Sequence, residues 1–501
     1  MIFLGIDLGT TGLKAVLSDE QGNIIGIGYR QYPLDVPHPG YAEQSPEAWY
    51  DAMCLAIRDV LAKTGISPDE IKSVGFSGQM HGLVALDENG NVLCPAIIHC
   101  DGRAFEEKQE ISSLVTIEQF GEWTQNRPNS GFQILSLMWL RKNRPEIYKK
   151  IRHILLPKDY IRYRLTGNFS TDVTDACSSL MFDCRNMRWS SNIIRIAGID
   201  PSILPDAEHN PYDIDGEVSG KAAEETGLAA GTLVAFGGGD TAMQAVANGV
   251  FSMGEASVSV GTSAQLLVAL DQPKYDPQLR THTFCHAPKN SWYIMGAILN
   301  ACLAQNWFDN NVLMEKDYVS LGQKAALSPA GSRGLLFLPY LTGERTPHMN
   351  EHASGAFLGL TLAHDRFDMQ RAVLEGVAYA LRDCLEIIQG LDISISRLLI
   401  SGGGGKSPLW RQIIADIFEM PLRQTDFEEQ AAMGAIICAQ IAGGAYPSFK
   451  EACAAQVREN GSVTEPDPKN FAAYREGYQL FREGYAANRE LFERLRRSQE
   501  H

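Results

Sequence analysis

Four short stretches of the chain could bring backbone N–H groups close to a phosphate. They lie at residues 9–12, 237–239, 261–263 and 402–405, each following an apolar run that is typical of a strand. Glycine lets main-chain N–H groups point at an anion, and Thr or Ser hydroxyls add donors. Taken singly, each stretch fits a hairpin turn or a helix stop better than a phosphate site. Four of them, in duplicated positions, favour a nucleotide held between two lobes.

Two aspartates beside these stretches could serve phosphoryl transfer. Asp7 ends the first apolar run, two residues before Gly9, where it could hold a hydrated Mg²⁺ ion beside phosphates. Asp240 follows three glycines and precedes a helical pattern over residues 241–248, so it is either a plain N-cap or the base that accepts a hydroxyl proton. Lys14, after the first turn, either contacts a phosphate or faces water.

The sequence lacks the two common phosphate-loop fingerprints. GxxxxGK[ST] is absent, which argues against a Walker loop, and GxGxxG is absent, so dinucleotide binding has no support. A nucleotide site would therefore be built from the turns at the strand ends.

Polar residues suited to a polyol lie in two further loops of the first half. His81 stands between glycines in the loop 78–82, where it could hydrogen-bond a sugar hydroxyl or cap the loop. Asp101 and Arg103, separated by Gly102, could bind sugar hydroxyls in the same way. Taken alone, that pair is better explained by an internal ion pair.

The elements that must carry these residues follow one plan. Residues 2–7, 13–18 and 24–32 predict a three-stranded meander joined by short turns. A helix is expected to begin after the N-cap Ser45 and to stop at Gly65, with apolar residues at a period of 3.6.

The second half repeats this plan. In the first half, a strand at 71–77 runs into the loop that holds His81. In the second half, a short strand at 398–401 runs into the glycine stretch 402–405 in the corresponding place. Residues 255–260 and 264–269 likewise predict two strands around a Gly-Thr turn. The repeat is one whole domain long, so we expect an α/β protein of two similar lobes.

A tail of different character ends the chain. Residues 461–468 predict a polar, proline-containing linker. Six apolar or aromatic residues then form a helical stripe: Tyr474, Tyr478, Phe481, Tyr485, Phe492 and Leu495. We expect this helix to pack on the second lobe, with a homodimer interface as the alternative. The predicted segments are 1–245, 246–445 and the tail 446–501.

Composition excludes several classes of partner. The chain has 501 residues and a formal net charge of −16, and its densest basic run, at residues 494–497, reads as a solvated helix face. A nucleic-acid or anionic-membrane partner is therefore not expected. The start shows no secretory signal, and no apolar run reaches the ~18 residues of a membrane span. Ten scattered cysteines without CxxC predict reduced thiols and a cytoplasmic location.

One group of residues has metal-like spacing. His282, Cys285 and His286 lie close together in the sequence, but no second cluster completes a site. Ordinary buried side chains are the better interpretation.

Taken together, these motifs resemble the FGGY family of carbohydrate kinases, in unbroken order from residue 1 to about Ala442. In the first half the resemblance rests on IDLGTTGLKAV near the start, GQMHG at 78–82, CDGR at 100–103, LPKDYIRYRLTG at 156–167, TDVTDACSSLMFD at 171–183 and GGGD at 237–240. In the second half it rests on GTSA at 261–264, LPYLTGERTPH at 338–348, GAFLGL at 355–360, DMQRAVLEG at 368–376 and GGGGKSPLWRQIIAD at 402–416.

The resemblance implies an α/β fold of two actin-like, ribonuclease-H-like lobes, with sugar bound mainly by the first lobe and ATP in the cleft. It implies Asp240 as the base and Asp7 near Mg²⁺, through water, and the phosphates. Residues implied to contact the sugar are Met80, His81, Asp101, Arg103 and Asp240. Residues implied to contact ATP are Gly9, Thr10, Thr11, Lys14, Gly261, Thr262, Ser263, Gly403 and Gly404.

Within the family, Met80-His81, the Asp-x-Arg pair and GERTPH best match members that phosphorylate D-xylulose at its 5-hydroxyl. Three departures from the common pattern are His99-Cys100 in place of Trp-Asn, Ser136 in place of Lys, and Cys177-Ser178 in the CSSLMFD motif. The first lies beside the sugar, so a kinase for ribulose, L-xylulose or a polyol stays an alternative. A non-catalytic actin-like ATP-binding protein is a further one.

Overall fold

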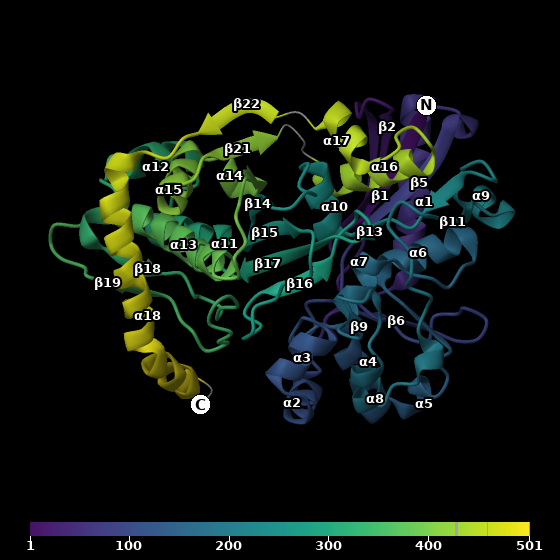
Figure 1. The fold of residues 1–501 in the computed structure, drawn as a ribbon, viewed down its shortest axis with the longest axis horizontal. Coiled ribbons are helices and arrows are strands. Elements are labelled where there is room, and N and C mark those ends of the chain that lie inside the picture. Colours follow the sequence, from purple (N-terminus) through teal and green to yellow (C-terminus); the bar gives the residue numbers. More distant parts are fainter. Residues whose placement is uncertain (426–428, 458, 500–501) are drawn as a thin grey trace.

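Two seven-stranded sheets form the cores of two lobes in the computed structural model, which describes residues 1–425, 429–457 and 459–499 (Figure 1). The first sheet has the order β11 (Ile214–Glu217), β12 (Leu233–Ala235), β5 (Ile71–Gly78), β1 (Ile2–Leu8), β2 (Gly12–Asp19) and β3 (Ile24–Gln31), with β13 (Gly238–Gly239) also paired to β5. The second has the order β16 (His282–Cys285), β17 (Trp292–Ile298), β15 (Ala264–Leu270), β14 (Glu255–Val260), β20 (Arg397–Ser401), β21 (Leu422–Thr425) and β22 (Glu459–Thr464).

The two sheets share one topology. In each, an antiparallel meander is joined to a parallel strand: β1 pairs with β2 and with the parallel β5, and β14 pairs with β15 and with the parallel β20. The Gly-Thr stretches therefore lie at the same corner of both sheets. This confirms the predicted two-lobed α/β plan and places the two Gly-Thr turns at corresponding positions of the two sheets.

Helices cover the faces of both sheets. First-lobe helices are α1 (Pro46–Thr64), α2 (Phe105–Leu114), α3 (Ile117–Trp123), α4 (Gln133–Asn143), α5 (Pro145–Tyr148), α6 (Pro157–Thr166), α7 (Val173–Ala176), α8 (Ser191–Ala197), α9 (Gly220–Thr226) and α10 (Asp240–Ala247). Later helices are α11 (Cys302–Phe308), α12 (Tyr318–Ala325), α13 (Arg366–Gln389), α14 (Gly402–Gly405), α15 (Pro408–Phe418), α16 (Gln430–Ala442), α17 (Phe449–Gln456) and α18 (Phe471–Gln499). None of the helices in the described ranges could cross a membrane.

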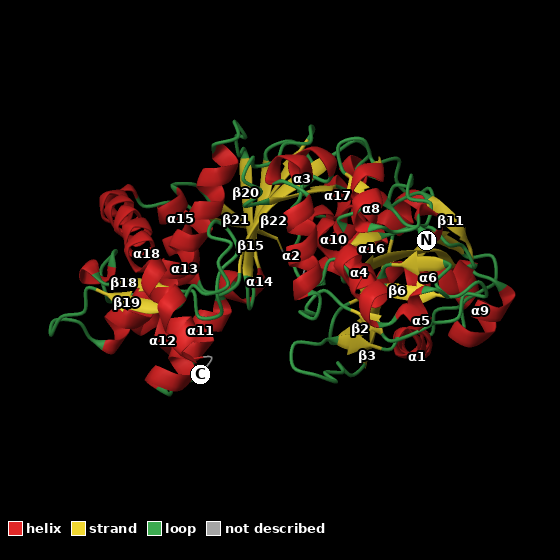
Figure 2. Cartoon of the chain, turned by 90° about the horizontal axis from the view of Figure 1, so that it is seen from below, coloured by secondary structure: helices red, strands yellow, loops and turns green. Residues whose placement is uncertain are grey.

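Four small two-stranded sheets complete the fold. They pair β4 (Glu43–Gln44) with β7 (Ala96–Ile97), β6 (Val84–Leu86) with β8 (His153–Leu155), β9 (Phe182–Asp183) with β10 (Arg188–Trp189), and β18 (Leu336–Leu338) with β19 (Ala356–Leu358). Seen from below, the second-lobe helices α11, α12, α13, α15 and α18 gather at one end of the molecule and the first-lobe helices at the other (Figure 2).

The first long helix begins and ends where its capping residues predict. The Ser45 side chain accepts the Ala48 N–H, Pro46 opens α1, and Gly65 has φ 70° and donates its N–H to the Leu61 carbonyl. Because a residue with a side chain resists that left-handed conformation, glycine defines the stop.

The chain returns to the first lobe near its end. Helix α16 packs on β1 and β5 and against α10, although it follows the second-lobe strands in sequence (Figure 1). Glycines allow this approach: a Cβ at Gly75 would lie 2.0 Å from the Ala435 carbonyl oxygen, and one at Gly5 2.5 Å from the Ala432 carbonyl oxygen. Residues 430–442 thus cover the first sheet, while the segment boundaries at 245 and 445 stay a prediction.

The C-terminal tail corrects two expectations. Residues 461–464, expected in a linker, belong to β22, which pairs with β21 at the edge of the second sheet. The polar composition of this segment suggested backbone groups bonded to water, but pairing with β21 gives the N–H and C=O groups partners within the sheet. Helix α18 packs against β18 and α15 of the second lobe as predicted, with Tyr474 and Phe481 buried, but Leu495 is exposed.

We expect Gly75→Ala to lower the free energy of unfolding by about 1–3 kcal/mol, because the added methyl group would push α16 away from β5. Urea unfolding measures the change. Gly220→Ala is the matched control, because its Cβ would meet open space in α9, and its stability should stay the same or rise by up to ~1 kcal/mol. Equal losses in the two variants would contradict this account of the packing.

Candidate active site

A cavity of about 200 Å³ lies between the lobes and is large enough for a small sugar. Its walls come from both halves of the chain. The first lobe contributes Thr10, Gln79, Met80, His81, His99, Asn129, Ser130, Phe132, Asp240 and Thr241, and the second contributes Gln265, His282, Phe284, Met295 and Arg345. Met80, His81 and Asp240 thus come together as predicted.

Asp240 is held at the start of α10 by a tightly packed turn. Gly238 and Gly239 pair with β5 in parallel, which fixes the backbone just before the aspartate. Gly237 has φ 68°, and a Cβ there would lie 2.2 Å from the Phe76 carbonyl oxygen, so only glycine fits. The three glycines therefore serve to place the aspartate rather than to form a loose loop.

The Asp240 carboxylate is poised to take a proton. Burial, and next the negative charge of Asp7, raise its pKa to about 6. A carboxylate in this range is ionised at neutral pH and is a stronger base than a free aspartate.

Asp7 ends β1 beside the first Gly-Thr turn. Burial raises the pKa of its carboxyl, and the nearby Glu429 adds to this while Lys14 opposes it. The Lys14 ammonium forms an ion pair with Glu429, at the start of α16. In this structure Lys14 thus contacts a carboxylate while its side chain stays partly exposed, and its contact with a phosphate stays a prediction.

His81 is fixed in one orientation. Its Nδ1 lies 2.7 Å from the Ser178 carbonyl oxygen, which can only accept, so Nδ1 carries the proton. Burial lowers the pKa of His81 to about 3, so the ring is neutral and Nε2 is an acceptor. Phe132 packs edge-on at 4.5 Å between ring centroids. The side chain thus offers a hydrogen-bond acceptor of fixed position to a hydroxyl group in the cavity.

Two further residues of the cavity, His99 and Arg345, carry polar groups, and of these only His99 was expected beside the sugar from the sequence. His99 has a buried Nδ1 without a partner in the described part of the chain, and burial together with Arg345 lowers its pKa. Arg345 comes from the second lobe, where its position in the GERTPH motif was the only signal. Gln79 lies in the GQMHG motif but was given no role, and Gln265 had no sequence signal, because only the fold brings it to the cavity.

Asp101 and Arg103 do not line this cavity. The Asp101 carboxylate accepts the Ala42 N–H at 2.6 Å and binds the guanidinium of Arg103 at 2.7–2.9 Å. Arg103 also pairs with Glu43 at 2.7 Å and stacks over the Tyr41 ring at 3.9 Å. The structure has the internal ion pair that the residues by themselves favoured, whereas the sugar contact that the family resemblance implies stays a prediction. Asp101 lies two residues after His99 in the same loop.

A second, larger pocket of about 750 Å³ lies in the second lobe. Four residues predicted to bind the nucleotide line it: Gly261, Thr262, Gly403 and Gly404. Helices α11, α12 and α13 contribute the rest of the wall through residues such as Gln305, Tyr318 and Gln370. Ser263 sits in the same turn, where its carbonyl accepts the Gly261 N–H at 2.9 Å.

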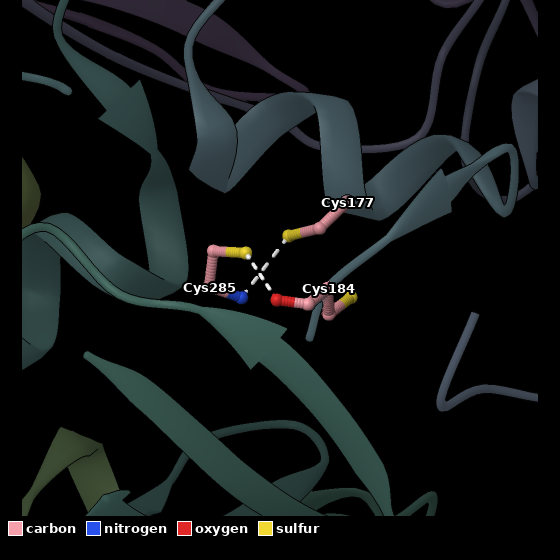
Figure 3. Close-up of side chains that lie close together, drawn as sticks. All are labelled: Cys177, Cys184 and Cys285. Carbon is pink, nitrogen blue, oxygen red and sulfur yellow. Dashed lines mark hydrogen bonds between the residues drawn. The ribbon is translucent and has the colours of Figure 1, made fainter. Parts of the chain in front are cut away.

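The residues with metal-like spacing are used structurally. His282 Nδ1 contacts the Asn126 amide oxygen at 3.1 Å, and His286 Nε2 contacts the Val250 carbonyl at 2.9 Å. Cys285 lies beside Cys177 and Cys184 (Figure 3), and the three sulfur atoms lie within 4.8 Å of one another. Each thiol also reaches a backbone carbonyl, as buried thiols commonly do.

The chain matches the model of the N-terminal domain of the FGGY family of carbohydrate kinases over residues 2–247, and that of the C-terminal domain over residues 256–443. The chain belongs to this family. Among FGGY kinases, it is 33% identical over 492 residues to "Xylulose kinase" from Bacillus subtilis (strain 168), covering 97% of both chains.

Solved structures show the same architecture. A ligand-bound xylulose kinase from Lactobacillus acidophilus matches with a TM-score of 0.93 and 27% identity, covering 99% of each chain. A gluconate kinase from the same organism matches with a TM-score of 0.91 and 27% identity, covering 97% of this chain and 98% of its own. The two actin-like lobes predicted from the sequence are thus confirmed. Kinases of this family use ATP as the phosphoryl donor for a carbohydrate.

We expect Gly403→Val to weaken ATP binding about 10-fold or more without loss of stability. A Cβ at this position meets no atom within 4 Å, so the side chain would project into the open space of the larger pocket. Calorimetric ATP titration and thermal melting check both parts. Gly403→Ala adds a single methyl group and should have the smaller effect, and unchanged ATP affinity in both variants would remove this pocket as the nucleotide site.

Proposed function

We propose that this FGGY kinase transfers the γ-phosphoryl group of ATP to the 5-hydroxyl of D-xylulose, with Asp240 as the base. The observation that carries the proposal is an aspartate with a raised pKa in the wall of a sugar-sized cavity, in a chain about one-third identical to proteins named xylulose kinase. The larger pocket in the second lobe is the proposed binding site of the other substrate, ATP.

In the proposed reaction, the sugar hydroxyl gives its proton to the Asp240 carboxylate as its oxygen forms a bond to the γ-phosphorus. The bond between that phosphorus and the bridging oxygen breaks, and ADP leaves with the electron pair. His81, held neutral by burial, accepts a hydrogen bond from another sugar hydroxyl and so orients the acceptor. Closure of the lobes over both substrates would exclude water and limit ATP hydrolysis.

We also propose that Mg²⁺ enters with ATP and is held through water by Asp7. The residues fit such an ion: the Asp7 and Asp240 carboxylates lie close enough for the Asp7 charge to raise the pKa of Asp240, and Thr10 lines the same cavity as Asp240. When bound, Mg²⁺ would neutralise charge on the phosphates. Gly9, Thr10 and Thr11 are proposed to bind phosphate through the turn in which Gly9 N–H donates to the Gly12 carbonyl at 3.1 Å.

Location and assembly complete the proposal. All ten cysteines are free thiols, which supports a reducing compartment and hence the cytoplasm. If the protein is a homodimer, the exposed leucines of α18 provide an apolar surface for the second copy; they are Leu480, Leu491 and Leu495. The partners are then sugar and ATP, without nucleic acid.

We expect turnover with D-xylulose to exceed that with every competitor in a panel of D-ribulose, L-xylulose, xylitol and D-gluconate. Coupled measurement of ADP release gives kcat/KM for each. Gluconate belongs in the panel because the cationic Arg345 in the cavity could bind a carboxylate. A competitor that matches or exceeds D-xylulose would refute the proposed substrate while leaving the kinase assignment intact.

We expect Asp240→Asn to remove most sugar-dependent turnover, a loss of about 100-fold or more, while ATP still binds. The active wild-type form has ionised Asp240, so kcat/KM for the sugar should fall as pH drops through about 6. Initial rates between pH 5 and 8 measure the acid limb. Full turnover in Asp240→Asn would show that another group accepts the proton.

A further inference from the structure

The turn that carries Asp240 is held from the side by a buried threonine. The Thr174 hydroxyl accepts the Gly239 N–H at 3.0 Å and donates its own proton to Asp172 Oδ2 at 2.5 Å. Thr174 has no exposed surface. Since Gly239 is the residue immediately before Asp240, this hydrogen bond fixes the peptide from which the proposed base projects.

A buried lysine anchors that threonine. Lys158 Nζ lies 3.1 Å from Asp172 Oδ1 and donates to the Phe236 carbonyl at 3.2 Å, so one ammonium group binds both the partner of Thr174 and the start of the glycine turn. The Thr174 N–H also donates to Asp172, at 2.8 Å. Lys158 and Asp172 are completely buried, and the same ammonium group also pairs with Asp159 at 2.6 Å and Asp175 at 3.4 Å. Removing Lys158 would therefore leave the Asp172 carboxylate without its cation in the protein interior.

The glycine turn is tightly packed on both sides. A Cβ at Gly238 would lie 2.7 Å from the Thr174 hydroxyl, and one at Gly239 would lie 2.9 Å from Cγ of Met80. The turn is therefore clamped between the threonine and a residue of the cavity wall, so a small shift on one side is transmitted to the other.

The same segment also holds the sugar-facing histidine. Ser178, in the 3-10 turn Cys177–Ser179 that follows α7, accepts the His81 N–H on its hydroxyl at 3.2 Å and the His81 ring proton on its carbonyl. Cys177 Sγ accepts the Cys285 N–H at 3.4 Å, which links the segment to β16 of the second lobe (Figure 3). Residues 172–179 thus connect the base, the histidine and the second lobe.

We propose that Thr174 is a positioning residue of this kinase, whose hydroxyl aims the Asp240 carboxylate into the sugar cavity through the Gly239 peptide. The inference rests on the proposed role of Asp240. Thr174 does not touch the substrate, so its removal should slow the chemical step without weakening ATP binding. A misplacement of a reacting group by ~1 Å can cost about 100-fold in rate.

Thr174→Val and Thr174→Ser test the proposal, because the first keeps the shape and the second keeps the hydroxyl. We expect Thr174→Val to lower kcat about 10- to 100-fold with KM for ATP unchanged, and Thr174→Ser to retain kcat within about 3-fold of wild type. Melting temperatures of the three proteins report folding. Equal kcat in Thr174→Val and wild type would overturn the proposal, as would an equal loss in Thr174→Val and Thr174→Ser.

A second pair of measurements covers a failure of Thr174→Val to fold. Thr174→Ala is then compared with Thr174→Ser, since the two differ only by the hydroxyl; the proposal expects the alanine variant to be about 10-fold slower or more, and equal rates would overturn it. Asp240→Asn is measured alongside. Full activity in Asp240→Asn would defeat the proposed base, whereas an inactive Asp240→Asn with a fully active Thr174→Val would defeat only the positioning role.

Discussion

The close approach of the glycine turn 237–239 to strand β5 is the constraint on which the site depends. The backbone of Gly237 touches the Phe76 carbonyl so closely that no Cβ can be accommodated. Parallel pairing of β13 with β5 then sets the direction in which α10 leaves the sheet, and Asp240 is the first residue of that helix. A rigid sheet edge holds the carboxylate of this proposed base more exactly than a free loop could.

Burial gives this carboxylate its chemistry and also makes the surrounding network intolerant of change. Desolvation raises the pKa of Asp240 and of Asp7. Because the two negative charges lie close together, binding a proton or a cation there is favourable. Behind them, Lys158 counters the charge of Asp172, whose pKa burial also raises. The interior charges therefore serve orientation, because a buried ion pair adds little stability once desolvation is counted.

The proposed ATP site gives a local explanation of how a chain of net charge −16 could hold a polyanion. Gly261, Thr262, Gly403 and Gly404 line the larger pocket, where main-chain N–H groups and a hydroxyl could meet the phosphates. An acid-rich composition therefore argues against a nucleic-acid partner but is compatible with a nucleotide substrate. Helix α16 follows the second-lobe strand β21 in sequence and packs on β1 and β5 of the first lobe, so the chain crosses between the lobes a second time.

The sequence alone determined the repeated strand plan, the helix caps at Ser45 and Gly65 and the placement of Asp240 after its glycines, because these depend on neighbours a few residues apart. Tertiary structure decided the rest. Residues 461–464 became a strand because an edge partner was available. Arg345 and Gln265 reach the cavity, and Thr174 reaches Gly239, only through contacts between distant segments, and such contacts follow from packing, which no local pattern encodes.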